Sequence, residues 1–134
     1  MRQELEEKLV KAAPVLLKDY HGDQMKTCMA WGMECDDGWF DLLMELCSKL
    51  EEINNSGNGR VVATQIKEKF GELCFYYYTE NMTKEEHNKV YEIVSEAEQR
   101  SWDICEICGK PATHTTKGWI KRLCNECYGK LDRK

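Results

Sequence analysis

The 134-residue sequence contains no apolar run that approaches about 18 residues, the length needed for a membrane-spanning helix. Its first twenty residues, MRQELEEKLVKAAPVLLKDY, mix charged and apolar residues at helical spacing. They therefore lack the uninterrupted apolar stretch of a signal peptide. The sequence also has no internal repeat and no low-complexity segment. Together these absences predict a cytoplasmic protein that does not enter a membrane.

The sequence also lacks a nucleophile motif, a phosphate-binding loop and a paired-carboxylate site. The residues most suited to acid–base chemistry are His21, Asp23, Asp36 and Asp37. Solvated loop carboxylates are the commoner explanation of such a group. We therefore predict that the protein is not an enzyme.

Charge is distributed unevenly along the chain, whose formal net charge is −5. Residues 1–101 carry 12 Lys/Arg and 20 Asp/Glu, whereas residues 102–134 carry 7 and 4. The densest acidic block, from Glu34 to Glu52, has a net charge of −6. Such a block repels nucleic acid and attracts basic protein surfaces.

Hydrophobic periodicity predicts an α+β fold in which helices pack on a β-hairpin. The predicted elements are a helix at 2–19, a helix at 36–53 with an aspartate N-cap, a loop at 54–60, a hairpin at 61–78 and a helix at 83–101. Pro14 predicts a break or kink in the first helix. The hairpin should turn near 69–72, and its three consecutive tyrosines suggest a second strand covered on both faces. Thr83 and Glu86 have the spacing of a capping box.

Eight cysteines are many for a cytosolic chain, where reducing conditions disfavour disulfides. Gly109 follows a Cys-x2-Cys pair and permits the backbone angles of a metal knuckle. A second such pair lies fifteen residues further on. Four thiolates suit tetrahedral Zn²⁺, so the spacing predicts a structural zinc site. Its predicted ligands are Cys105, Cys108, Cys124 and Cys127.

His114 lies between the two pairs and is an alternative ligand, although four sulfurs already complete the shell. A closed shell has no position for water, which argues against metal catalysis. The last 33 residues alone could not bury enough surface to fold, so metal binding should supply most of their folding free energy. We therefore predict an acidic α+β core at 1–101 and a zinc-ribbon module at 102–134.

The remaining cysteines call for less specific predictions. Cys47 lies within the apolar stripe of the helix at 36–53, and Cys74 alternates with core residues in a strand. Both are expected to act as small hydrophobes. Cys28 and Cys35, with His21 and nearby carboxylates, are an alternative second metal site, although Cys-x6-Cys matches no common motif.

The C-terminal module could instead contact nucleic acid. Basic residues and a tryptophan alternate there in a pattern suited to phosphate contact and base stacking, at Lys117, Trp119, Lys121 and Arg122. Few cations are clustered, however, and the rest of the chain is acidic. Trp119 is also explained more simply as the small core of the module.

Four stretches carry a resemblance to a known group: MECDDGWFDLLMELCSKLEEI, VVATQIKEKFGELCFYYY, CEICGK and KGWIKRLCNEC. Over residues 25–127 the chain is similar to small proteins carried by phages and other mobile elements of bacteria. Most of that group has no assigned function. The size, acidity and zinc content also resemble a type II-A anti-CRISPR protein. That resemblance implies a non-enzymatic inhibitor, acting in the cytoplasm of the bacterial host, that binds the RNA-guided effector nuclease.

CRISPR effectors expose basic channels for the guide and target strands, and an acidic helix face could compete for such a surface. The residues that we predict for this contact are Asp37, Asp41, Glu45, Glu51 and Glu52. The alternative is that they form a solvated face. The expected partner is thus the effector nuclease, and neither nucleic acid nor membrane is expected to bind directly.

Overall fold

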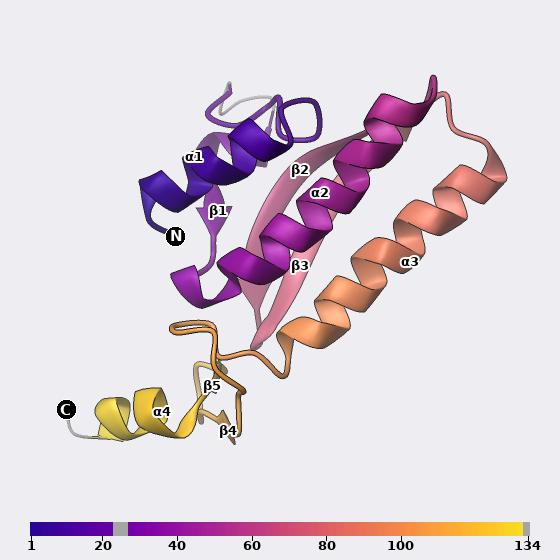
Figure 1. The fold of residues 1–134 in the computed structure, drawn as a ribbon. Coiled ribbons are helices and arrows are strands. Elements are labelled where there is room, and N and C mark those ends of the chain that lie inside the picture. The colour runs from indigo at the N-terminus through magenta and orange to yellow at the C-terminus, as the bar shows by residue number, and fades with distance from the viewer. Residues whose placement is uncertain (23–26, 133–134) are drawn as a thin grey trace.

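The computed structural model describes residues 1–22 and 27–132, which form a mixed α+β fold with a small sheet (Figure 1). The predicted fold class is therefore confirmed. The elements are α1 (Gln3–Ala12), the 3₁₀ turn η1 (Cys28–Trp31), β1 (Met33–Glu34), the 3₁₀ turn η2 (Asp37–Trp39), α2 (Phe40–Ser56), β2 (Arg60–Lys69), β3 (Glu72–Glu80), α3 (Lys84–Ser101), β4 (His114–Thr115), β5 (Arg122–Leu123) and α4 (Asn125–Asp132).

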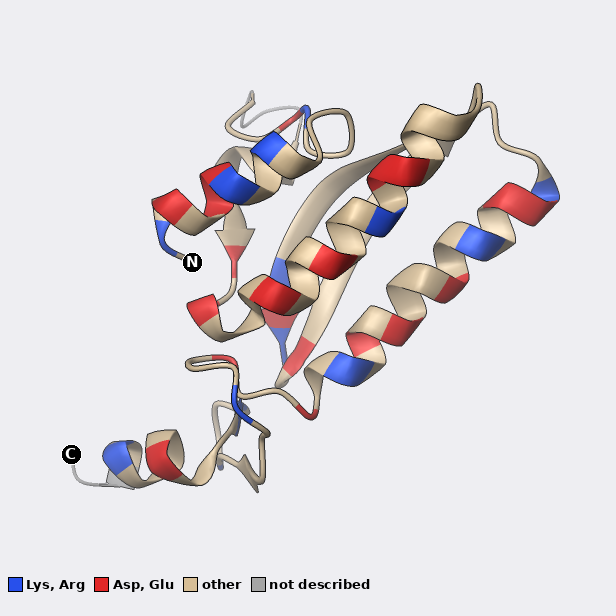
Figure 2. Cartoon of the chain, in the orientation of Figure 1, with Lys and Arg blue, Asp and Glu red and all other residues tan. Residues whose placement is uncertain are grey.

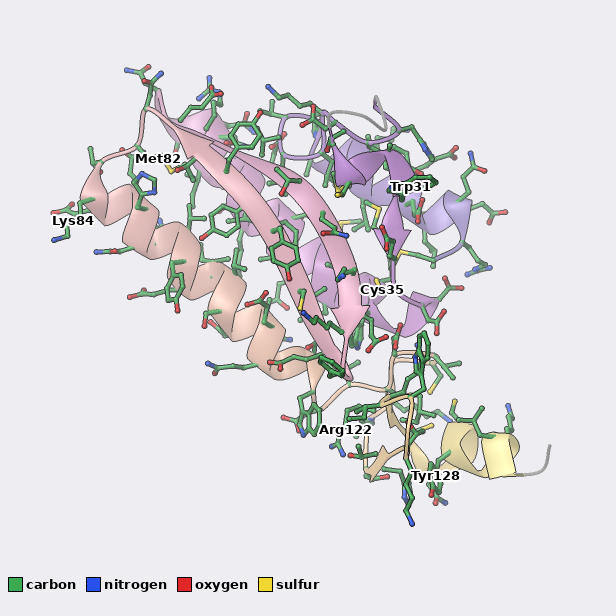
Figure 3. All side chains as sticks on the ribbon, turned by 180° about the vertical axis from the view of Figure 1, so that it is seen from behind. Trp31, Cys35, Met82, Lys84, Arg122 and Tyr128 are labelled. Atoms are coloured by element: carbon green, nitrogen blue, oxygen red, sulfur yellow. The ribbon has the colours of Figure 1, made fainter. Side chains whose placement is uncertain are left out.

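The main sheet has the strand order β1-β2-β3, and a separate two-stranded sheet pairs β4 with β5. β1 runs parallel to β2, whereas β2 and β3 form an antiparallel hairpin. In Figure 1, α2 and α3 lie on one face of the hairpin and α1 lies beside α2. Figure 3 shows the molecule from the opposite side, where the hairpin lies nearer the viewer than the helices. Tyr76 and Tyr78 are exposed, so the prediction that β3 is covered on both faces is wrong.

The first helix ends at Ala12, well before the predicted end at residue 19. Proline disfavours helical backbone in the residue before it and lacks an N–H, so Pro14 ends the helix. The backbone N–H groups of Val15 and Leu16 instead donate to the carboxylate of Glu51, at 2.9 and 3.0 Å. The predicted break is confirmed, and α1 does not resume beyond it.

The start of α2 differs from the prediction. The 3₁₀ turn η2 precedes the helix, and the side chain of Asp36 makes no capping hydrogen bond, so the predicted aspartate cap is wrong. At its other end α2 extends to Ser56, into the predicted loop. There the Asn54 side chain accepts a hydrogen bond from Val61 N–H at 2.7 Å and donates one to the Val61 carbonyl at 3.0 Å. These contacts join the last turn of α2 to β2.

The β2–β3 hairpin turns where predicted, with Lys69 opposite Glu72. Phe70 and Gly71 form its two-residue turn, and both have positive φ, +54° and +85°. Two consecutive positive φ values are typical of the two-residue hairpin turn whose twist matches that of the flanking strands. A positive φ is unusual for phenylalanine. The turn holds the Phe70 side chain outside the core, with 66% of its surface exposed.

The predicted capping box of α3 is confirmed. Thr83 Oγ1 accepts a hydrogen bond from Glu86 N–H at 3.2 Å, and the Glu86 carboxylate accepts one from Thr83 N–H at 3.1 Å. Together these contacts satisfy two backbone donors that would otherwise lack partners at the helix start.

Side chains of α3 also bind the outer edge of β3. The backbone N–H of Leu73 donates to Ser101 Oγ at 2.8 Å, and that of Phe75 donates to the Glu98 carboxylate at 3.0 Å. Edge strands normally present such donors to solvent. Here two of them are satisfied inside the fold.

The core lies between the helices and the sheet. Its largest member is Trp39, which is completely buried at the start of α2. The other large, fully buried side chains of this core are Leu9, Leu16, Leu17, Met29, Leu43, Leu46, Leu50, Ile66 and Leu73. A smaller, separate cluster surrounds three of the C-terminal cysteines.

Candidate metal centre

Four cysteine side chains converge from two segments, the connection between α3 and β4 and the junction of β5 with α4. The sulfur atoms of Cys105, Cys108, Cys124 and Cys127 all lie within 4.8 Å of one another. Sulfurs bound to one tetrahedral metal at about 2.3 Å lie roughly 3.8 Å apart, so the cluster is close to the size that such an ion needs. In residues 1–22 and 27–132 these four form the one group of this kind that can hold a metal ion.

The first knuckle is a tight turn. Gly109 N–H donates to the Cys105 carbonyl at 2.9 Å, and Cys105 N–H donates to the Lys110 carbonyl at 2.7 Å. Gly109 has a φ of +84°, a conformation that glycine adopts without a steric penalty. Gly109 therefore adopts the unusual backbone angle predicted for the residue after the first cysteine pair.

The second knuckle joins β5 to α4. Cys127 N–H points at Cys124 Sγ at 3.4 Å, and Tyr128 N–H donates to the Cys124 carbonyl at 3.0 Å. The hydrogen bond from Cys127 N–H, with smaller contributions from neighbouring thiols, lowers the pKa of Cys124 to about 7, whereas burial raises the pKa of Cys108 and of Cys127. Thiolate is the form of cysteine that binds metal, so the contact with Cys127 N–H favours ligation by Cys124.

The four cysteines differ in their exposure to solvent. Cys105, Cys124 and Cys127 are buried, whereas Cys108 is exposed. A metal ion could therefore enter past Cys108. Four sulfurs would complete a tetrahedral shell and leave no position for water or substrate, which is the arrangement of a structural metal site.

His114, the alternative ligand, lies outside the cysteine group. Its ring stacks on Tyr128, with centroids 4.5 Å apart, and its Nε2 lies 3.0 Å from Asn125 Oδ1. These contacts hold the imidazole against α4, so it supports the second knuckle from outside.

The first knuckle is joined to the core at the turn before α2. Gly38 N–H donates to the Glu106 carbonyl at 2.6 Å, and Asp36 N–H donates to the Glu106 carboxylate at 2.9 Å. The buried Trp39 donates its indole N–H to the Ile104 carbonyl at 3.1 Å. Three hydrogen bonds, one of them from the largest residue of the core, therefore anchor the metal module to the turn before α2.

Gly38 is required for this approach. A Cβ at this position would overlap the carbonyl oxygens of Cys105 and Glu106. The Asp-Gly-Trp sequence, which predicts a helix start, also forms the surface on which the knuckle packs. Sequence reasoning missed this second role because hydrophobic periodicity carries no information on contacts between distant segments.

Glu106, between the two cysteines of the first knuckle, is almost completely buried. Its carboxylate forms an ion pair with Lys121 Nζ at 3.0 Å, and Lys121 also lies 3.7 Å from Glu68 and 3.8 Å from Asp36. Burial raises the pKa of Glu106, although the hydrogen bond and charge of Lys121 oppose that effect. Lys121 thus bridges the module and the core, and its charge is neutralised within the protein.

Arg122, from the predicted nucleic-acid set, is also used internally. Its guanidinium lies over the Trp102 ring, 4.5 Å from the centroid, and its Nε donates to the Trp102 carbonyl at 2.9 Å. The two remaining nitrogens donate to Thr115 and Ala112. Of the four predicted residues, Lys117 and Trp119 are exposed, and Trp119 is not the buried core of the module.

The predicted acidic contact face is only partly available. Glu51 is 5% exposed and binds backbone N–H groups, so its assignment to a partner surface is wrong. Asp37 pairs with Arg2 at 2.7 Å, and Glu45 pairs with Arg100 at 3.0 Å and Lys49 at 3.1 Å. Asp41 and Glu52 are exposed on α2.

The alternative second metal site is not assembled in the described residues. Cys28 is exposed and Cys35 is buried, and neither joins His21 in a metal-binding group. The carboxylate of Asp37 faces Arg2, whereas His21 Nδ1 lies 3.4 Å from the Ala30 carbonyl. Asp23, the remaining candidate for acid–base chemistry besides Asp36, lies outside the described residues.

Cys47 is buried, as predicted, and burial raises the pKa of its thiol. Cys74 is half-buried on β3.

Comparisons of the chain with models of protein families, with curated proteins and with solved structures found no match. Among the helices that the structure describes, none combines the length and apolar character needed to cross a membrane.

Proposed function

We propose that the four cysteines bind Zn²⁺ and that the protein is a zinc-stabilised, non-enzymatic binding protein. One observation carries this proposal: the cluster has four sulfur ligands, and its first knuckle is anchored to the buried Trp39. Four soft thiolates prefer zinc over hard cations such as magnesium or calcium. A metal in this position would hold the C-terminal module against the core.

The partner in this proposal is an RNA-guided type II CRISPR effector nuclease, and the site of action is the cytoplasm of the bacterial host. The resemblance to phage and anti-CRISPR proteins motivates this choice. Acidic residues recur along α2 and α3 (Figure 2), and Asp41 and Glu52 expose their carboxylates. An acidic helix surface is complementary to the basic channel in which an effector holds nucleic acid.

The test is inhibition of target cleavage by a reconstituted type II effector with its guide RNA. The wild-type protein should inhibit cleavage. The double variant Asp41→Lys with Glu52→Lys should inhibit at least about tenfold more weakly, because charges at the rim of an interface mainly change the rate of association. Glu4→Lys with Glu7→Lys, on the exposed surface of α1, is the matched control. Failure of the wild-type protein to inhibit or bind any tested type II effector would reject this partner.

A zinc-ribbon nucleic-acid-binding or transcription accessory factor is the second candidate. The exposure of Lys117 and Trp119 on one turn favours it. Gel-shift experiments with single- and double-stranded nucleic acid distinguish the two functions. Tight, steeply salt-dependent binding by the isolated protein would support this second function over the first.

A further inference from the structure

Two exposed aromatic side chains, far apart in sequence, flank a hollow beside the metal module. Phe70 comes from the turn between β2 and β3, and Trp119 comes from the connection between β4 and β5. They are 66% and 79% exposed. The hollow has a volume of about 270 Å³, and its lining residues are Glu68, Lys69, Phe70, Gly118, Trp119 and Ile120.

The two turns that form the hollow are held in place by the contacts between module and core. Lys121, two residues after Trp119, reaches Glu68 on β2 at 3.7 Å. Glu68 in turn accepts a hydrogen bond from Gly71 N–H at 2.8 Å. Arg122, labelled in Figure 3 where the hairpin end meets the module, packs against Gly71 together with Trp102. The hollow is therefore formed before any ligand arrives, which reduces the entropy lost on binding.

The exposed charge in the lining of the hollow is positive, while Glu72, paired opposite Lys69 in the hairpin, adds an exposed carboxylate beside it. Lys69 and Lys117 are exposed, and Lys69 Nζ lies 5.8 Å from the centroid of the Phe70 ring. The one carboxylate in the lining, Glu68, is 10% exposed and already bound to Gly71 and Lys121. Lys69 belongs to the lining, and Lys117 directly precedes its Gly118 in sequence. Exposed aromatics together with exposed lysines would attract a ligand that combines apolar and anionic groups.

We infer that this hollow binds a protein segment that inserts an apolar side chain between Phe70 and Trp119 and places carboxylates beside Lys69 and Lys117. Exposed aromatics on a rigid support are the side chains that most often dominate binding energy at protein interfaces. The surface is distinct from the exposed acidic residues of α2, so this inference does not depend on the effector nuclease being the partner.

A nucleic-acid ligand fits the same surface less well. Nucleic-acid binding strengthens with the number of phosphates neutralised, and here Lys121 and Arg122 are engaged within the protein. Residues 1–101 add a net charge of −8, which would repel the rest of a polynucleotide chain. A short acidic peptide needs fewer cationic contacts and extends less far over the acidic residues 1–101, so both disadvantages are smaller for it.

The experiment uses the full-length, zinc-loaded protein and synthetic blocked pentapeptides, with binding followed by the NMR shift of the Trp119 indole N–H. The acidic probe is Asp-Asp-Phe-Asp-Asp. The two comparison probes replace its four aspartates with lysine or its phenylalanine with alanine. We expect the acidic, aromatic probe to bind best, and each comparison probe to bind about tenfold more weakly or not at all.

Variants of the protein complete the test, with binding of the same probe followed by fluorescence anisotropy. Phe70→Ala and Trp119→Ala should each weaken binding about tenfold or more. Tyr91→Ala, which removes a 67% exposed aromatic from α3, should leave it unchanged. Lys69→Glu with Lys117→Glu should reverse the preference between acidic and basic probes.

Three outcomes would overturn the inference. Equal binding of the acidic and basic probes would show that the lysines do not select the ligand. Unchanged binding in both aromatic variants would place the peptide elsewhere. Tighter binding of a ten-residue oligo(dT) at the same aromatics would assign the hollow to nucleic acid. In each case inhibition of the effector nuclease would remain a separate question.

Discussion

Gly38 N–H donates to the Glu106 carbonyl across 2.6 Å, so the residue that precedes the buried Trp39 touches the backbone of the first metal knuckle. The two residues are 68 positions apart in sequence. Folding of the C-terminal module is therefore coupled to the start of α2, and a change on one side should be measurable on the other.

Gly38→Ala should destabilise the protein by about 1–3 kcal/mol, because the added methyl overlaps the carbonyls of Cys105 and Glu106. Urea unfolding of the zinc-loaded protein measures the change. Gly129→Ala is the control, since a Cβ at that position on α4 meets no atom within 4 Å and alanine favours helix. Equal stability of the Gly38→Ala variant and wild type would contradict the close approach.

Removal of zinc, or Cys105→Ser, should unfold the module while α2 and α3 persist. The loss of metal-binding free energy should lower the Tm by roughly 10 °C or more. Trp39 contacts the module and Trp102 belongs to it, so near-ultraviolet circular dichroism should change, whereas the helical far-ultraviolet signal should largely remain. Cys28→Ser, an exposed cysteine outside the cluster, is the control. An unchanged near-ultraviolet spectrum after chelation would refute the coupling.

Glu51→Ala should cost about 1–3 kcal/mol, because it leaves the N–H groups of Val15 and Leu16 without their buried acceptor. Its neighbour Glu52 is exposed, and Glu52→Ala should change the free energy of unfolding by less than about 0.5 kcal/mol. Denaturant unfolding of both variants gives a matched comparison. Similar values for the two would mean that the Glu51 contacts contribute little.

The pH dependence of stability should show the effect of Glu98. Partial burial raises the pKa of this carboxyl, although its hydrogen bond from Phe75 N–H opposes the shift. The native state then holds the proton more tightly than the unfolded chain, so Glu98 favours folding below its unfolded pKa. That contribution is lost as pH rises through the raised native pKa.

Glu98→Gln keeps an acceptor for Phe75 N–H but removes the titration. Relative to this variant, the wild-type protein should lose stability as pH rises from about 4, the usual pKa of a glutamate, towards neutral pH. Free energies of unfolding measured for both proteins across that range check the sign. A constant difference would show that folding does not shift the pKa of Glu98.

Local signals in the sequence predicted the elements well. The alternation on both sides of Phe70 predicted the hairpin, the spacing of Thr83 and Glu86 predicted the start of α3, and Pro14 predicted the break after α1. In each case the determining interaction lies within a few residues along the chain. The cysteine spacing predicted the convergence of the four cysteines for the same reason, since each knuckle is a local turn.

Long-range contacts explain what sequence reasoning missed. Glu51 is a residue type expected on an exposed helix face. It is buried instead, because Pro14 ends α1 and the backbone N–H groups of Val15 and Leu16 then need an acceptor. Lys121 lies in a basic stretch, yet its partners Glu68 and Glu106 come from a different strand and from the first knuckle. Neither pairing leaves a periodic signal in the sequence.

The binding of Ser101 and Glu98 to the edge of β3 limits how this protein can associate. An incoming strand at this edge would find the N–H groups of Leu73 and Phe75 already engaged, and would have to displace α3 to pair with them. Growth of the sheet by strand addition is thereby opposed on this side, which protects a tyrosine-rich strand from aggregation. Recognition of a partner would then depend on side chains at exposed surfaces rather than on shared backbone pairing.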